Sequence, residues 1–541
     1  MGRGILCTLL LLLPLLAESR YTEFRYGSFE IFTNVGDKEA RELLNELEQL
    51  RHATGVLIGK DDPETVWPIR ILHVKGKTTS SELKLGRDAH MATVSTVTPE
   101  LRAAIVRLLI EDNARRMPES IEGGLVDLLS TLQVDRTKVT LGAPPAKQSK
   151  DWARLQMLSV DPAYSGKLRV LISSLQQGVD RETAYRNAFE QTPAQVEKRL
   201  EEYLKAGKFE TVPFSSKPLD LRRQFYAREV DRAKAAVIEG DLALALGNRN
   251  EAIARYKAAG DTPEAKDGLG LAQLDSASLA SATGPRALVE KSKLASTPAA
   301  DKRALLLKAA EGNKRWAEPH ILLAANESEP LRKLPHMKKV AELQPRNAKN
   351  WENLALLQEQ VNQFTDAGKS WSAALRASVD DGEQARIQAA KARSEELRVA
   401  QQIAEKQAAK RKEEEELNAV RNKALAQIRA AEAKVNAGNQ PVDKSKPLDW
   451  YQEEKPPARV TGNLFRVDCT GKAAKLHLRT AEETDVALLV VDPSKIVISG
   501  GGEKMFACGI QKPARTIVVL HNGKEGKKTG TTGEVLSIEI H

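Results

Sequence analysis

Aromatic residues and cysteines are scarce in this sequence. Phe, Trp and Tyr make up 4% of the 541 residues, whereas charged residues make up 29%. This composition favours helical repeats rich in Ala and Leu over one dense enzyme core, and the length allows three or more domains. The net charge of +9 is spread along the chain rather than gathered in one arm. Such a charge is weak evidence for nucleic-acid binding, so we expect no nucleic-acid partner.

Long apolar runs are also missing, with one exception near the N-terminus. Residues 5–17 are mainly apolar, Arg3 precedes them, and Ala17 and Ser19 have the spacing of a cleavage site. These features are typical of a secretory signal peptide, here over residues 1–19. The run is too short for a comfortable membrane span. We therefore expect an exported protein, periplasmic or extracellular, without a transmembrane segment in the mature chain.

Removal of the signal peptide leaves two cysteines, Cys469 and Cys508. Export to an oxidising compartment favours a disulfide between them. Two buried free thiols at strand ends fit the spacing equally well, because spacing alone does not fix the geometry of a bond.

The sequence also lacks the usual motifs of metal and nucleophile chemistry. No two of its eight histidines have a spacing that would place both on one turn of a helix. No G-x-S-x-G motif of a hydrolase nucleophile is present. We therefore expect neither a metal nor a cofactor.

Residues 100–132 carry the clearest functional signal. The phrase MPESIEGGLVDLLST, residues 117–131, resembles the segment that supplies the carboxylate ligand in gluzincin-type zinc peptidases, where the preceding helix carries HExxH. Residues 28–51 resemble the opening of a family of exported bacterial proteins in which a gluzincin-like domain precedes tetratricopeptide repeats. The resemblance implies such a domain over residues 20–215, with an α/β start followed by helices.

The residues that would bind zinc are absent from this segment. Ala103, Ala104 and Arg107 stand where the HExxH residues are expected, and Gly123 stands in place of the carboxylate ligand, with Glu122 one position early. Zinc needs imidazole, thiolate or carboxylate donors, and none of the four replacements has one. The segment therefore predicts a pseudo-metallopeptidase. A hydrolase of unrecognised type, or a residual peptidase binding metal through Glu122, remains the main alternative.

Residues 219–380 have the pattern of three to four tetratricopeptide-type repeats. The first copy places Gly247, Ala252, Tyr256 and Ala259 in the small and bulky positions of such a repeat, where small residues let two helices approach and a large one fills the groove. A generic helical bundle is the alternative. A second copy has its repeat residues at Trp351, Leu354, Ala355, Ala367, Trp371 and Ala374.

A repeat array of this kind can hold a protein or peptide partner in a groove. The residues expected to line that groove are Trp351, Gln358, Asn362, Lys369 and Trp371. For the two tryptophans, packing inside the repeat is the competing interpretation.

The C-terminal third divides into three parts. Residues 383–436 are rich in Ala, Glu, Lys, Arg and Gln, which favours a long solvated helix, with a partner-dependent coiled coil as the alternative. Residues 438–457 form a linker by their Pro, Gly and charge content. Residues 458–541 alternate in short runs that predict a small β-barrel or sandwich, and they resemble a C-terminal module of the same exported repeat proteins.

The sequence thus predicts a multidomain α+β protein that works as a non-catalytic exported scaffold. The helical repeats and the pseudo-peptidase domain would provide its interaction surfaces. Attachment to the cell envelope through the C-terminal β domain is a further alternative.

Overall fold

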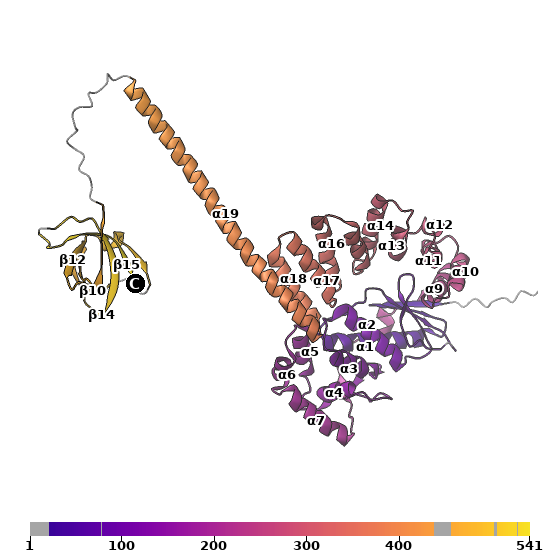
Figure 1. The fold of residues 1–541 in the computed structure, drawn as a ribbon. Helices are drawn as coiled ribbons and strands as arrows, with labels where there is room; N and C mark the ends of the chain where they lie inside the picture. Colours follow the sequence, from indigo (N-terminus) through magenta and orange to yellow (C-terminus); the bar gives the residue numbers. More distant parts are fainter. Residues whose placement is uncertain (1–20, 77, 438–455, 502–505, 527) are drawn as a thin grey trace, which may run out of the picture. The chain divides into compact units, whose positions relative to one another are not determined.

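The computed structural model describes residues 21–76, 78–437, 456–501, 506–526 and 528–541 (Figure 1). The chain divides into two compact units, Met1–Glu415 and Glu416–His541. The expected signal peptide and nearly all of the expected linker lie outside the described residues. None of the helices in the described ranges combines the length and the apolar character that a membrane span requires.

The first unit begins with a six-stranded sheet in which the central strands run parallel. Helix α1 (Asp37–Ile58) connects β2 to β3, and every residue of β2 and β3 is buried, as expected of strands covered on both faces. The strand order is β4-β5-β3-β2-β1-β9, with β1 antiparallel to β2. The strands are β1 (Thr22–Tyr26), β2 (Phe29–Thr33), β3 (Ile69–His73), β4 (Lys84–Leu85), β5 (His90–Val94) and β9 (Arg228–Glu229).

A body of helices follows the sheet and shares one hydrophobic core with α1. Helix α2 begins at Pro99, where the hydroxyl of Thr98 accepts a hydrogen bond from the Leu101 amide and so caps the helix. Helix α3 packs so closely on α4 that a Cβ on Gly124 would lie 2.7 Å from the Asp151 carbonyl oxygen. The helices are α2 (Pro99–Asn113), α3 (Glu119–Ser130), α4 (Lys150–Val160), α5 (Leu168–Gln176), α6 (Arg181–Phe189) and α7 (Pro193–Ala206); a small sheet contains β6 (Gln133–Asp135), β7 (Lys138–Leu141) and β8 (Val212–Phe214).

The next ten helices pack in sequence as antiparallel pairs, in the manner of tetratricopeptide-type repeats (Figure 1). Tyr256 is buried, and its ring occupies the space that a Cβ on Gly240 or Gly268 would need, so these glycines permit the close packing. The helices are α9 (Arg232–Ala245), α10 (Arg249–Ala258), α11 (Pro263–Gln273), α12 (Ser276–Leu279), α13 (Pro285–Lys293), α14 (Ala299–Gly312), α15 (Glu318–Asn326), α16 (Pro330–Leu343), α17 (Ala348–Gln360) and α18 (Phe364–Ala377).

Helix α19 (Asp381–Asn436) is 56 residues long. Its first turns pack on the last repeat, where Ile387 joins a core with Trp371 and Ala374. From residue 402 to residue 437 every side chain is exposed, which agrees with the expected long solvated helix.

The C-terminal domain is a barrel. Its strand order is β12-β11-β10-β14-β15-β13, and a parallel pairing of β12 with β15 closes the sheet on itself. The five strands of the closed ring are β12, β11, β10, β14 and β15, and β13 pairs with β15 outside the ring. Five strands in such a Greek-key order are the architecture of OB-fold barrels. A disulfide joins Cys469 at the end of β10 to Cys508 just before β14, with Cα atoms 5.8 Å apart. The strands are β10 (Ala458–Thr470), β11 (Ala473–Arg479), β12 (Asp485–Val490), β13 (Val497–Gly500), β14 (Gly509–His521) and β15 (Gly533–Ile540).

The first repeat helix covers the second face of the N-terminal sheet. Ile238 of α9 packs against Phe32, Leu72 and Met91. Helix α1 lies against the sheet as well. The sheet therefore packs against both α1 and the first repeat helix, and the repeats are part of the fold of the first unit.

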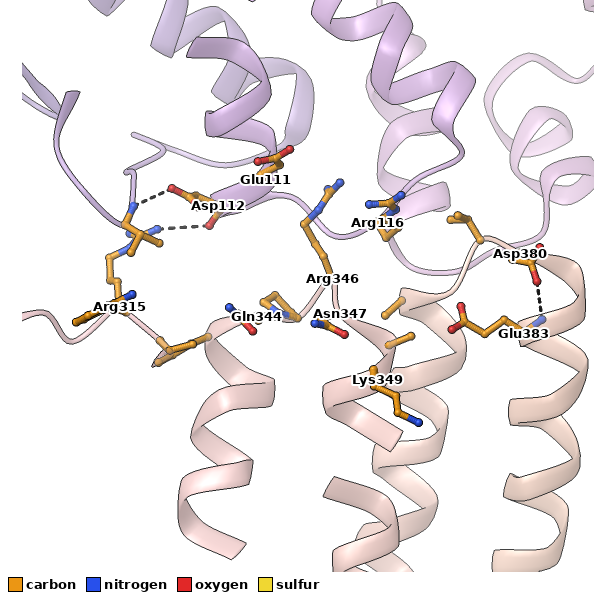
Figure 2. A pocket seen from close by; sticks show the side chains of 18 residues that line it. Glu111, Asp112, Arg116, Arg315, Gln344, Arg346, Asn347, Lys349, Asp380 and Glu383 are labelled. Carbon is orange, nitrogen blue, oxygen red and sulfur yellow. Dashed lines mark hydrogen bonds between the residues drawn. The ribbon is translucent and has the colours of Figure 1, made fainter. Parts of the chain in front are cut away.

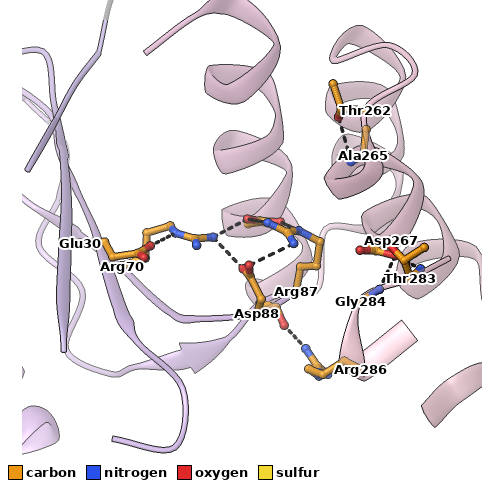
Figure 3. Close-up of polar contacts among 12 residues, drawn as sticks. Glu30, Arg70, Arg87, Asp88, Thr262, Ala265, Asp267, Thr283, Gly284 and Arg286 are labelled. Carbon is orange, nitrogen blue, oxygen red and sulfur yellow. Dashed lines mark hydrogen bonds and ion pairs between the residues drawn. The ribbon is translucent and has the colours of Figure 1, made fainter. Parts of the chain in front are cut away.

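A buried network of charges fixes this junction (Figure 3). The carboxylate of Asp241 in α9 accepts hydrogen bonds from Arg70 at 2.7 Å, from Arg87 at 3.0 Å and from the Tyr256 hydroxyl at 2.9 Å. Arg70 also donates to Glu30 and Asp88, each at 2.8 Å. The contacts of Asp241 with Arg70 and Arg87 therefore cross the interface of sheet and repeats, whereas those of Arg70 with Glu30 and Asp88 lie on the sheet side of it.

The charges in this network depend on one another. Burial disfavours the charged form of Arg70 and Arg87, but the carboxylates around them outweigh that effect and raise the pKa of both side chains. Burial raises the pKa of Asp241, and the two guanidinium groups oppose that shift. Removal of one partner would leave the others buried without compensation.

We expect the Asp241→Asn variant to lose about 3 kcal/mol of stability, because two buried guanidinium groups lose their shared carboxylate. Urea unfolding of the full chain measures the change. Asp301→Asn, at an exposed position of α14, is the matched control and should change stability by less than about 0.5 kcal/mol. Equal midpoints for the two variants would contradict the structural role of Asp241.

His90 in β5 gives the junction a pH dependence. Burial lowers its pKa from 6.5 to about 4, and the nearby Arg286 acts in the same direction. The unfolded chain therefore binds more protons between these two pH values, so stability falls as pH drops from 6.5 through 4. The His90→Gln variant should lose about 2 kcal/mol less than wild type between pH 7 and pH 4.5 in urea titrations. Equal losses would contradict this assignment.

Candidate functional site

Three of the expected positions, Ala103, Arg107 and Gly123, correspond to ligands and Ala104 corresponds to the general base. None of the four is fully buried, although Ala103 packs against the core of the first unit. In α2, Ala103 and Ala104 are half-buried and Arg107 is exposed, whereas Ile105 and Val106 are buried. In α3, Gly123 is exposed and has open space where a Cβ would stand. None of the four side chains offers a zinc donor. Within the described ranges, no cluster of three or more His, Cys, Asp or Glu side chains is arranged to hold a metal.

Glu122, which directly precedes the expected ligand position in the sequence, contacts the repeat array. One of its oxygens accepts a hydrogen bond from the Met117 amide at 2.7 Å, and the other forms an ion pair with Arg346 at 2.6 Å. Arg346 comes from the turn between α16 and α17, and it also donates to the Arg115 carbonyl oxygen at 3.2 Å. A guanidinium group therefore occupies one side of the carboxylate that a residual metal would need.

A second turn of the repeat array docks beside the first. Arg315, between α14 and α15, pairs with the Glu64 carboxylate at 3.0 Å and donates to the Glu64 carbonyl oxygen at 2.8 Å. The ring of Trp316 packs edge-on against Trp67, with centroids 5.2 Å apart. The repeats thus hold the segment before β3 as well as the connection between α2 and α3.

Between these contacts lies a cleft with a volume of about 660 Å³ (Figure 2), within the usual size of a ligand site. Its rim belongs to the end of α2, to the two docking turns and to the start of α19. Burial raises the pKa of Asp112 in this cleft, although the Val66 amide donates to its carboxylate at 2.8 Å. We call this space the junction cleft. Its charged lining residues are Glu111, Asp112, Arg116, Arg315, Arg346, Lys349, Asp380 and Glu383.

The junction cleft is lined mainly by charged and polar residues. Of the described residues that line it, none is Ser, Cys or His, so it lacks the side chains that most often serve as nucleophile or general base. Glu111 and Arg116 are exposed, which leaves charges of both signs accessible to a ligand.

The residues expected in the repeat groove do not share one surface. Trp371 is buried and donates to the Glu359 carboxylate at 2.7 Å. Gln358 is buried and accepts from the Ser370 hydroxyl at 2.6 Å. Both side chains thus lie inside the α17–α18 pair, which is the packing role that competed with binding for Trp371.

The other three groove residues are more accessible and lie apart. Trp351 is half-buried and donates to the Pro345 carbonyl oxygen at 3.1 Å. Asn362 is exposed in the turn after α17, and Lys369 is exposed and pairs with Asp366 at 2.8 Å. A binding role for these three residues stays a prediction.

Sequence reasoning missed the cations of the junction cleft. Arg315 and Arg346 occupy turns between repeat helices, where a lone arginine is an ordinary surface residue. Their partners Glu64 and Glu122 are 251 and 224 positions away in the chain. The only available signal was a basic residue beside a Trp or Pro in each turn.

Comparisons with known proteins place few limits on function. No protein-family model and no curated protein matches the chain. Among solved structures, the crystal structure of MamA is 19% identical, covers 26% of this chain and 93% of its own, and has a TM-score of 0.22. Yeast Tom70 is 11% identical, covers 68% of this chain and 74% of its own, and has a TM-score of 0.22. TM-scores this low do not support a transfer of function from either protein, so the function proposed below depends on this chain's own residues.

We expect the Arg346→Ala variant to loosen the docking of the repeats, because Glu122 loses a charged partner that is largely shielded from water. Stability should fall by about 1–2 kcal/mol. Hydrogen exchange at the amides of residues 114–117 should become faster than in wild type. Arg332→Ala, which removes an exposed arginine and its surface ion pair in α16, is the control. Unchanged exchange in Arg346→Ala would show that this contact does not hold the junction.

Proposed function

We propose that this chain is a non-catalytic exported scaffold that binds an extended, charged segment of a protein partner in the junction cleft. The observation that carries the proposal is the ion pair of Glu122 with Arg346. It joins the former ligand segment to the repeat array, so one cleft is built from both parts.

The chemistry of the site supports the absence of catalysis. Ala103, Ala104 and Gly123 bring no donor atom, and Arg107 brings a permanent cation. A residual metal would have only the Glu122 carboxylate, which would first have to exchange a guanidinium group for the ion. A single carboxylate is far from the three protein ligands of a catalytic zinc site.

The charges of the junction cleft favour a peptide that carries both signs. Arg116 and Lys349 can pair with acidic side chains, whereas Glu111 and Asp380 can pair with basic ones. The buried junction at Asp241 keeps the walls of the cleft in one compact unit. A pre-formed cleft of this kind lowers the ordering cost that binding must overcome.

Export and envelope contact through the C-terminal barrel stay predictions from the sequence. Export would place the barrel in an oxidising compartment, which is compatible with the Cys469–Cys508 disulfide.

A photo-crosslinking residue introduced at Lys349 should capture the partner in native envelope preparations, whereas the same residue at Lys338, exposed on α16, should not. Capture should fall by about tenfold or more in the double variant Arg116→Glu with Glu111→Lys, which reverses two of the exposed charges of the junction cleft. The matched control is Lys338→Glu with Glu342→Lys on α16, which should retain capture.

Metal and peptidase assays on residues 20–541 test the non-catalytic part separately. We expect purified protein without stoichiometric zinc and without casein cleavage. Bound zinc whose removal abolishes cleavage would contradict the proposal, and so would capture that is insensitive to the charge reversal.

A further inference from the structure

The last part of α19 carries an apolar stripe on an otherwise charged helix. The largest members are strongly exposed: Leu417 at 68%, Val420 at 67% and Ile428 at 53%. No member of the stripe is buried against another described residue. We call it the α19 stripe, and its members are Leu417, Val420, Ala424, Ile428, Ala431 and Val435.

The spacing of the α19 stripe keeps it on one face over its whole length. Its members follow one another at three, four, four, three and four residues, so the pattern repeats after eleven residues. Eleven residues correspond to three turns of about 3.67 residues, close to the 3.6 of a straight α-helix. The stripe therefore does not follow the seven-residue repeat of a left-handed coiled coil. Towards the N-terminus the same face carries Lys406, Lys410 and Glu413, so the stripe begins at Leu417.

We propose that the α19 stripe binds the same stripe of a second copy of this chain, with the two helices antiparallel. Full overlap places Leu417 opposite the partner's Val435, and the stripe covers about 28 Å of helix. Because the arrangement has twofold symmetry, each contact occurs twice. This inference concerns assembly and does not rest on the function proposed for the junction cleft.

Charge complementarity selects the second copy and the direction. In the overlapped antiparallel pair, Arg421 lies beside the partner's Glu432 on one flank of the stripe. On the other flank, Glu416 lies beside the partner's Lys434. Twofold symmetry then gives four attractive pairs along the two flanks, in the way that flanking charges set partner and direction in coiled coils.

A parallel pair is disfavoured by the same charges. It would place the acidic run at residues 413–416 beside its own copy. It would also set Glu413, on the face of the stripe, against the partner's Glu413. Like charges so placed oppose association.

The oligomeric state of the full mature chain tests the proposal. Sedimentation equilibrium at several concentrations should show a reversible dimer. Leu417→Asp with Ile428→Asp should raise the dissociation constant about a hundredfold, because charged groups would enter the interface from both copies. Ala419→Asp with Ala430→Asp is the matched control, since it has the same eleven-residue spacing and the same new residue on the opposite face. Circular dichroism should show equal helix content in the two double variants.

A charge exchange tests the direction. Glu416→Lys and Lys434→Glu should each weaken the dimer about tenfold, and the two changes together in one chain should restore it. In a parallel pair these positions lie about 27 Å apart along the helices, so no restoration would follow. A wild-type chain that stays monomeric at every concentration would overturn the proposal, as would control variants that dissociate like the stripe variants. Capture of a different protein by the stripe of a monomeric chain would also overturn it.

Discussion

The buried carboxylate of Asp241 is the interaction on which the first unit depends. It lies in the first repeat helix and accepts hydrogen bonds from Arg70 in β3 and from Arg87 beside β5. A fully buried charge requires its partners, since loss of one leaves the rest uncompensated. The sheet and the repeats therefore have a fixed position relative to each other. Because α9 is fixed on the sheet, the later turns of the repeat array reach α2 and α3.

The arrangement is compatible with the proposal that zinc ligands are absent from this part of the chain, because the expected ligand positions do not carry its core. The buried face of α2 contains Leu101, Ile105 and Leu109, which contribute to the core, whereas Arg107 and Gly123 are exposed. Residues on this open face can change without disturbing the core. The repeat turn that carries Arg346 contacts the segment whose sequence resembles the ligand segment of gluzincins, and Glu122 is the docking contact there.

Local sequence patterns allowed much of the fold to be predicted, whereas contacts between residues far apart in the chain could not be predicted. The second repeat around Trp371 and the alternating strands of the barrel follow from residue spacing. Docking of α9 on the sheet joins residues 171 positions apart, and closure of the barrel pairs Leu488 with Gly533, so neither leaves a local pattern. The prediction that Gln358 and Trp371 line a groove was also based on a local pattern. In the structure both side chains are buried inside the α17–α18 pair, where they fill the space between the two helices.

The long helix α19 joins two kinds of surface in one chain. Its start lines the junction cleft through Asp380 and Glu383, just before and within the first turn, and its end carries the α19 stripe. In an antiparallel dimer each assembly would hold two clefts. A partner with two binding segments would then bind the second cleft at a raised effective concentration, provided that its linker spans the distance. Modest charges in each cleft would then suffice to retain the partner, because binding at two clefts of one dimer gives a higher overall affinity than binding at a single polar cleft.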